Sequence, residues 1–166
     1  MTGDATTADR PGEPGARERL DILRSTRTVA MVGASANPAR PSHFVATYLL
    51  ASTDYDVWFV NPTVSEILGH PVYASLDDLP GVPDLVDVFR RADDLPDVLD
   101  ETIAVGARTL WLQLGLRDEA LAERARSAGL RVVMDRCLKI EHARFDGGLH
   151  LAGFDTGVIT SRRRLR

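Results

Sequence analysis

Five short, mostly apolar runs recur along the chain, separated by longer stretches of mixed polarity. They cover residues 28–32, 56–60, 84–89, 109–112 and 130–134. Runs of this length, rich in β-branched and other apolar residues, are typical of strands buried on both faces of a parallel sheet. Gly33 follows the first run at once, at a point where the chain must turn sharply.

Helices are predicted between these runs. They cover residues 17–25, 42–51, 92–105 and 117–128. The apolar residues of 92–105 recur at helical spacing, and Gly106 and Gly129 stand where a C-terminal glycine commonly ends a helix. Ser42 is a suitable N-cap for the helix at 42–51.

Strands and helices therefore alternate, which predicts parallel strands joined by right-handed crossovers. We expect an α/β fold: a three-layer, doubly wound, Rossmann-like domain with about five strands in a parallel sheet. Between the second and third runs, the pattern indicates a loop at 63–72, a short strand at 72–73 and a capped turn at 75–80. Beyond Lys139 the pattern fades.

The chain has the composition of one ordinary globular domain, with 166 residues, 44% of them hydrophobic and 27% charged. Residues 1–16 show no apolar period, so we expect a disordered N-terminal arm. Residues 17–145 form the predicted domain. Residues 146–166 form a C-terminal extension with a basic tail, whose apolar residues are candidates for an edge segment or a swapped arm.

Charge and cysteine content narrow the class of protein. The formal net charge of -4 provides no global basic field for nucleic acid. A single cysteine leaves no internal disulfide and suits a reducing compartment. No apolar run approaches the roughly 20 residues needed to span a bilayer. We expect a cytoplasmic protein with neither a membrane nor a nucleic-acid partner.

The loop between the first strand and the helix at 42–51 is the strongest candidate for a binding site. A strand, a turn of small residues and a helix N-terminus offer free backbone N–H groups to an anion, usually phosphate. Ser35 and Ser42 can donate hydroxyl hydrogen bonds, and Arg40 can hold a phosphate through two parallel ones. The alternative is a plain connecting turn with a solvated arginine.

A nicotinamide dinucleotide suits this loop less well. The Gly-x-Gly-x-x-Gly fingerprint is absent, because no glycine stands two residues after Gly33. The acidic residue that would hold a ribose hydroxyl at the end of the second strand is replaced by Asn61 and Pro62. These two departures lower the expectation of a dinucleotide without excluding one.

Loops after the later strands carry further candidates. Asn61 can pair with a base or a ribose, or it can simply end its strand. Phe89 can pack on an adenine and Arg90 can reach a phosphate, or the two are a core aromatic followed by a surface arginine. Gln113 and Gly115 are better candidates, because a glycine lets a ligand approach the backbone closely.

Catalytic chemistry is not evident. A nucleophilic Cys137 needs a pKa lowered by a base or a positive neighbour, and Arg136, Lys139 and His142 are near it in sequence. A buried, unreactive thiol is the alternative that we favour. The spacing of Cys137, Glu141 and His142 fits no zinc pattern, so no metal site is predicted. No Ser-His-Asp order and no Walker lysine stand out.

Five short motifs, each at the end of a predicted strand, resemble those of the small CoA-binding domain proteins. That family is similar to the nucleotide-binding domain of the succinyl-CoA synthetase alpha subunit. The motifs are Val-Gly-Ala-Ser at 32–35 with Arg-Pro-Ser at 40–42, Val-Asn-Pro at 60–62, Val-Asp-Val-Phe-Arg at 86–90, Trp-Leu-Gln-Leu-Gly at 111–115 and Met-Asp-Arg-Cys at 134–137. The resemblance covers roughly residues 25–142.

The resemblance implies a Rossmann-like fold that binds coenzyme A or an acyl-CoA. Twelve residues are implied as its contacts, in four groups. The phosphates would meet Gly33, Ala34, Ser35, Arg40 and Ser42. The adenosine would lie by Asn61 and Pro62, the pantetheine or pyrophosphate by Phe89 and Arg90, and the far side of the cleft would be lined by Gln113, Gly115 and Cys137.

Three functions follow as hypotheses. The first is a CoA-binding module without chemistry of its own. The second is an acyl-CoA ligase-like subunit that needs a partner, because the chain leaves no room for the second domain, with its phosphorylated histidine, of the synthetase subunit. The third is an NAD(P)-binding regulatory domain. A homodimer or another protein partner stays open.

Overall fold

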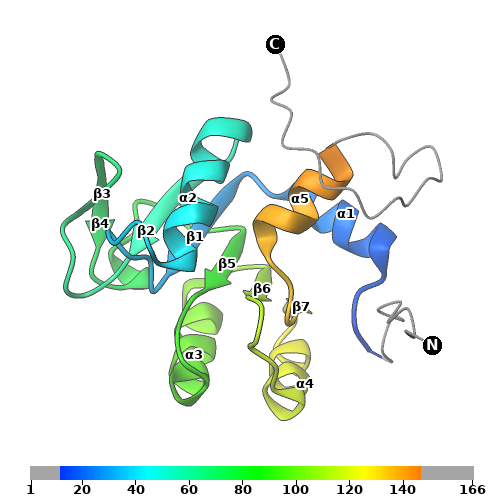
Figure 1. Cartoon of the computed structure of the whole chain (residues 1–166). Coiled ribbons are helices and arrows are strands. Elements are labelled where there is room, and N and C mark those ends of the chain that lie inside the picture. The colour runs from blue at the N-terminus through cyan, green and yellow to red at the C-terminus, as the bar shows by residue number, and fades with distance from the viewer. Residues whose placement is uncertain (1–11, 147–166) are drawn as a thin grey trace, which may run out of the picture.

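A computed structural model of the protein describes residues 12–146 (Figure 1). A seven-stranded sheet runs through this part of the chain in the order β3-β4-β2-β1-β5-β6-β7. Its strands are β1 Thr28–Val32, β2 Asp56–Val60, β3 Glu66–Ile67, β4 His70–Tyr73, β5 Leu85–Val88, β6 Thr109–Leu112 and β7 Arg131–Val133. All neighbouring strands are parallel except β3 and β4.

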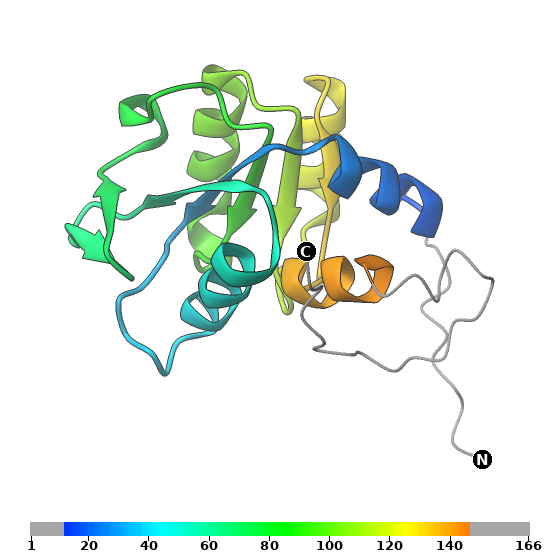
Figure 2. The ribbon, with the colours of Figure 1, turned by 90° about the horizontal axis from the view of Figure 1, so that it is seen from above.

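Helices cover both faces of the sheet, which makes three layers (Figures 1 and 2). The helices are α1 Ala16–Ser25, α2 Pro41–Ser52, α3 Leu95–Val105, α4 Glu119–Ser127 and α5 Leu138–Asp146, with 3-10 turns η1 Leu76–Asp78 and η2 Ala92–Asp94. α1, α2 and α5 lie on one face, and α3 and α4 lie on the other. The predicted Rossmann-like α/β fold is confirmed.

The central strands form because their side chains alternate between two apolar cores. In β1, Val29 and Met31 pack toward α1, α2 and α5, whereas Ala30 and Val32 pack toward α3 and α4. All four residues of β5 and all four of β6 are buried. A strand with helices on both sides must be apolar on both sides, which explains why these runs show no polar alternation.

Several local predictions are wrong. α2 begins at Pro41, with Arg40 at the N-cap position, so Ser42 is not the cap. The predicted loop at 63–72 contains β3 and the start of β4, a small hairpin that extends the sheet beyond the five predicted strands. After Lys139, where the pattern fades, residues 140–146 belong to α5.

The described residues include all of the predicted domain, residues 17–145. Of the predicted N-terminal arm, residues 1–11 lie outside them, and so do residues 147–166 of the C-terminal extension with its basic tail.

β1 lies inside the sheet, between two parallel neighbours. It pairs with β2, the next strand along the chain, on one side, and with the later strand β5 on the other. The connections therefore reverse direction beside β1, and ligands in such sheets bind outside the carboxyl ends of strands at that reversal.

Candidate functional site

A cavity of about 670 Å³ opens at the carboxyl ends of β1, β5 and β6. Its first wall is the β1–α2 loop with the start of α2, and its second wall is the β6–α4 loop with the start of α5. Phe89 and Arg90, after β5, lie between the walls. The lining residues are Gly33, Ser35, Ala39, Arg40, Pro41, Ser42, Phe44, Val45, Phe89, Arg90, Gln113, Leu114, Leu116, Cys137, Lys139 and Ile140.

Gly33 lets the first wall lie directly against the chain after β5. Its φ of +83° is one that other residues rarely adopt, and a Cβ built there would lie 2.8 Å from the carbonyl oxygen of Phe89. The backbone N–H of Gly33 also donates to Val60, on the neighbouring β2. Only glycine fits between β1 and the Phe89 backbone, so this residue sets the shape of the cavity.

Short-range hydrogen bonds close the first wall. The buried Ser42 hydroxyl accepts from the backbone N–H of Ser35 at 3.0 Å, across the loop. The Ser35 hydroxyl accepts from Asn37, and the Asn37 side chain accepts from Ala39. Each hydroxyl keeps its own hydrogen, so Ser35 and Ser42 can still donate to a ligand.

The N-terminus of α2 is open toward the cavity. No side chain caps it, and Pro41 occupies its first turn. Because the first N–H groups of a helix have no intrahelical partner and carry partial positive charge, this end favours an anion. Arg40 is exposed beside it, and Arg90 adds a second guanidinium that is 3.5 Å from the Asp94 carboxylate. Lys139 supplies a third cation from the second wall.

Gln113 is held from behind by a buried acid. Its Nε2 donates to Oδ1 of Asp87 in β5, and the atoms lie 2.5 Å apart. Asp87 is completely buried, and burial raises its pKa from 3.8 to about 8, although the hydrogen bond from Gln113 lowers it in part. The carboxyl is therefore neutral at pH 7.

Asp135 ties the two segments of the second wall together. It lies just after β7 with a φ of +54°, a region that Asp enters more readily than most residues. Its carboxylate accepts from the Gly115 backbone N–H at 2.7 Å, and its own N–H donates to Leu116. The β6–α4 loop and the segment that leads into α5 are thereby fastened to each other.

Charged side chains fix α5 in place. The buried Glu141 carboxylate pairs with Arg19 of α1 at 3.0 Å, with Arg136 at 3.3 Å and with Arg144 at 3.6 Å. The Trp111 indole donates to the carbonyl oxygen of Arg136 from within the core. These contacts position the helix that brings Lys139 and its neighbours to the cavity.

Cys137 is a half-buried thiol in the second wall. Burial raises its pKa, and backbone N–H groups at Ile140 and Lys139 lower it in part. Asp87 raises this pKa further when its carboxyl is ionised, and the charge of Lys139 lowers it. A raised pKa leaves little thiolate, which is the nucleophilic form. The environment therefore favours an unreactive thiol.

Eight of the twelve predicted contacts line this cavity. They are Gly33, Ser35, Arg40, Ser42, Phe89, Arg90, Gln113 and Cys137. The other four, namely Ala34, Asn61, Pro62 and Gly115, do not line it. Ala34 is buried in the core beneath the loop. The Asn61 side chain donates to Ala34 and accepts from Thr63, so it braces the β2 end and the first wall.

Sequence reasoning missed eight lining residues. They are Ala39, Pro41, Phe44, Val45, Leu114, Leu116, Lys139 and Ile140. Two of these are unusually exposed for their type, Phe44 at 59% and Leu114 at 62%. The missed residues adjoin predicted ones in sequence, so extending each predicted loop into the following helix would have found most of them.

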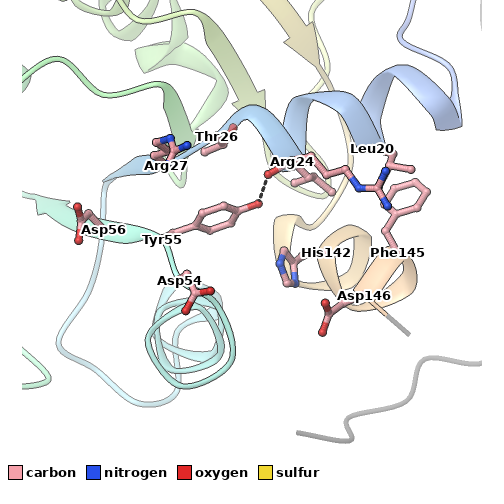
Figure 3. A pocket seen from close by; sticks show the side chains of 11 residues that line it. Leu20, Arg24, Thr26, Arg27, Asp54, Tyr55, Asp56, His142, Phe145 and Asp146 are labelled. Carbon is pink, nitrogen blue, oxygen red and sulfur yellow. Dashed lines mark hydrogen bonds between the residues drawn. The ribbon is translucent and has the colours of Figure 1, made fainter. Parts of the chain in front are cut away.

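A second cavity, of about 520 Å³, lies at the amino ends of β1 and β2, between α1 and α5 (Figure 3). The Tyr55 hydroxyl donates to the Leu23 carbonyl oxygen at 2.6 Å, and His142 meets the Tyr48 hydroxyl at 2.9 Å. Burial raises the pKa of Tyr48 to about 12. Among the described residues that line this cavity, none begins a helix, so it lacks the feature that favours an anion in the first one.

Residues 12–146 show neither a metal cluster nor a membrane-spanning helix. No group of three or more His, Cys, Asp or Glu side chains there is placed to hold a metal ion. None of the helices in that range is long and apolar enough to cross a membrane.

The chain is similar to proteins of known sequence and structure. The chain is 37% identical to the uncharacterized protein YneT of Bacillus subtilis over 130 residues, 78% of this chain and 96% of YneT. A Thermus thermophilus protein of solved structure matches with 39% identity and a TM-score of 0.74, over 78% of this chain and 98% of that one.

A larger protein shares the domain. The dinucleotide-forming acetyl-coenzyme A synthetase 1 of Candidatus Korarchaeum cryptofilum matches with 27% identity and a TM-score of 0.60. The match covers 69% of this chain but only 26% of the synthetase. The family model described as the CoA binding domain matches residues 27–143, and the chain therefore belongs to the CoA binding domain family.

Proposed function

We propose that the protein binds coenzyme A or an acyl-CoA in the 670 Å³ cavity and carries out no reaction on it alone. The observation that carries this proposal is the uncapped N-terminus of α2, which opens into a cavity that also presents Arg40, Arg90 and Lys139. An open helix end beside several cations suits the phosphates of CoA.

The remaining lining fits the rest of CoA. The cavity continues from the charged first wall to Leu114, Leu116 and Ile140 on the second. An uncharged, largely aliphatic arm would remove this apolar surface from water. Gly33 lets the first wall lie directly against Phe89 and Arg90, because any side chain there would collide with the Phe89 backbone.

The Cys137 thiol supports binding over catalysis. Its raised pKa makes a nucleophilic role unfavourable, and the synthetase that shares this domain is about four times longer than the matched part. We expect Cys137→Ser to leave CoA affinity unchanged. A ligase-like activity that depends on this thiol would instead be lost in that variant.

The test is a thermal-shift and calorimetry series with CoA, acetyl-CoA, dephospho-CoA, NAD, NADP and ATP at matched concentrations. A ligand at about 100 times its Kd stabilises a fold by roughly 2.7 kcal/mol, a rise of several degrees for a domain of this size. We expect this rise with CoA and a loss of affinity of about tenfold in Arg40→Ala, from a charge-assisted contact.

Arg108→Ala is the matched control, because Arg108 is exposed and does not line the cavity. It should leave CoA affinity unchanged. A rise with NAD or NADP but not with CoA would replace the proposal with a dinucleotide-binding domain.

A further inference from the structure

The carboxyl of Asp87 is a polar group in the middle of the sheet that packing does not explain. It pairs in register with Met31 and Trp111, and all three are completely buried. Oδ1 accepts from Gln113, but Oδ2 has no hydrogen-bond partner among the described residues. A buried acid with an unpartnered oxygen costs stability, so a role beyond packing is needed to account for it.

Asp87 controls which end of Gln113 faces the cavity. A carboxamide has a donor end, Nε2, and an acceptor end, Oε1. One of the two Nε2 hydrogens is donated to Asp87, behind the cavity wall, which fixes the carboxamide and leaves Oε1 as its hydrogen-bond acceptor for a ligand. No hydrogen bond from residues 12–146 engages Oε1.

We propose that Asp87 is a positioning residue, which holds Gln113 so that its Oε1 accepts a hydrogen bond from an amide N–H of the ligand. This inference rests on the proposed function and names the part of CoA that the second wall recognises. The pantetheine arm contains two secondary amides, whereas the nucleotide end contains none.

The surroundings of Gln113 favour an amide N–H as its partner. Besides Cys137 and Lys139, the second wall is lined by the apolar side chains of Leu114, Leu116 and Ile140, which accept no hydrogen bond. An amide N–H that enters an apolar wall loses its hydrogen bond to water and must find a new acceptor. Gln113 provides that acceptor at the wall, and Asp87 provides its orientation.

The experiment measures the Kd of two ligands, CoA and 3′,5′-ADP, the second of which lacks the pantetheine arm. Gln113→Met removes the acceptor, and Asp87→Leu removes its support while filling the same space. Each substitution should raise the Kd of CoA by about three- to tenfold, the range expected for one neutral hydrogen bond. Binding of 3′,5′-ADP should change by less than about twofold.

A double-mutant cycle tests whether Asp87 acts through Gln113. If it does, the variant with both substitutions binds CoA no more weakly than the weaker single variant, because the second change removes nothing further. Asp87→Asn keeps a carbonyl oxygen at Oδ1, so it should restore CoA affinity to the wild-type value. The positioning role would be overturned if the losses of CoA affinity in the two single variants added in the double variant. It would also be overturned if Asp87→Asn bound CoA as weakly as Asp87→Leu.

Thr102→Val is the control for a general loss of stability. Thr102 is a buried residue on α3 whose hydroxyl donates to Val98, on the far side of the sheet from Gln113. It should lower the melting temperature without changing either Kd. If Asp87→Leu fails to fold, Gln113→Met decides alone, because wild-type CoA affinity in that variant overturns the proposal. A wild-type protein that binds neither ligand would overturn the proposed function itself.

Discussion

The two walls of the cavity differ in the sequence distance that their hydrogen bonds span. In the first wall, Ser35 and Ser42 are seven residues apart. In the second wall, Gly115 bonds to Asp135, 20 residues away, and Gln113 to Asp87, 26 residues away. A short loop can close by itself, whereas the second wall exists only after β5, β6 and β7 have paired in register.

This difference gives the walls different weaknesses. The first wall depends mainly on turn chemistry that one segment of the chain supplies, together with the close approach at Gly33 and the hydrogen bond from Asn61 to Ala34. The second wall depends on buried polar groups that distant segments bring together. Substitutions in the first wall should therefore act mainly on the local loop, and those in the second should report on the whole sheet.

Gly33→Ala should have the largest effect, because it disturbs the place where the first wall packs directly against the chain that follows β5. The added Cβ would lie 2.8 Å from the Phe89 carbonyl oxygen, on a backbone with φ of +83°. We expect a loss of roughly 3–5 kcal/mol in the free energy of unfolding, from collision and backbone strain together. Urea denaturation measures it. Gly69→Ala is the control, because its φ of +77° is similar but no atom lies within 4 Å.

Asp87→Asn should stabilise the protein, by an amount that depends on pH. The pKa of Asp87 rises from 3.8 to about 8 on folding, so below about pH 4 the acid is neutral in both states. Between pH 4 and 8 only the unfolded chain ionises, which progressively destabilises the folded state, and above pH 8 the penalty is constant. The asparagine variant avoids this penalty, because a carboxamide does not ionise.

The free energy of unfolding of Asp87→Asn should exceed that of the wild type by on the order of 2–4 kcal/mol at pH 9. This difference should shrink toward zero near pH 4. Denaturation series at several pH values measure it. A gap that stays constant across this range would mean that the carboxyl is not protonated in the folded protein.

Asp135→Ala should lower the free energy of opening the second wall by about 1–2 kcal/mol. Alanine accepts no hydrogen bond from Gly115 and tolerates the φ of +54° poorly. Hydrogen exchange of the Gly115 amide, followed by NMR, is the sharpest measurement. Asp135→Asn keeps both the acceptor and the backbone preference, so its exchange rate should match that of the wild type.

Ser42→Ala should have the smallest effect, a loss of about 1 kcal/mol in the free energy of unfolding, because it removes one neutral hydrogen bond within a loop. Ser52→Ala, at the exposed end of the same helix, provides the comparison. If Ser42→Ala costs several kcal/mol, the first wall is not locally determined and the contrast between the walls fails.

Sequence patterns predicted the central sheet well because apolar runs report burial directly. β1, β2 and β6 begin and end where the runs do. α5 was missed for a physical reason, since its buried face contains the acid Glu141, which three arginines neutralise. A buried salt-bridged carboxylate looks like a surface residue to any search for apolar periodicity.

The sequence by itself determined the five main strands, the loop after β1, the family resemblance and eight residues of the cavity. Each of these depends on neighbours in the chain, or on motifs that sit within a few residues. Only the tertiary structure decided that Asp87, from the middle of a strand, stands behind Gln113, and that Asp135 fastens Gly115. Such pairings follow from strand register and helix placement, which fix distances between residues that no local pattern connects.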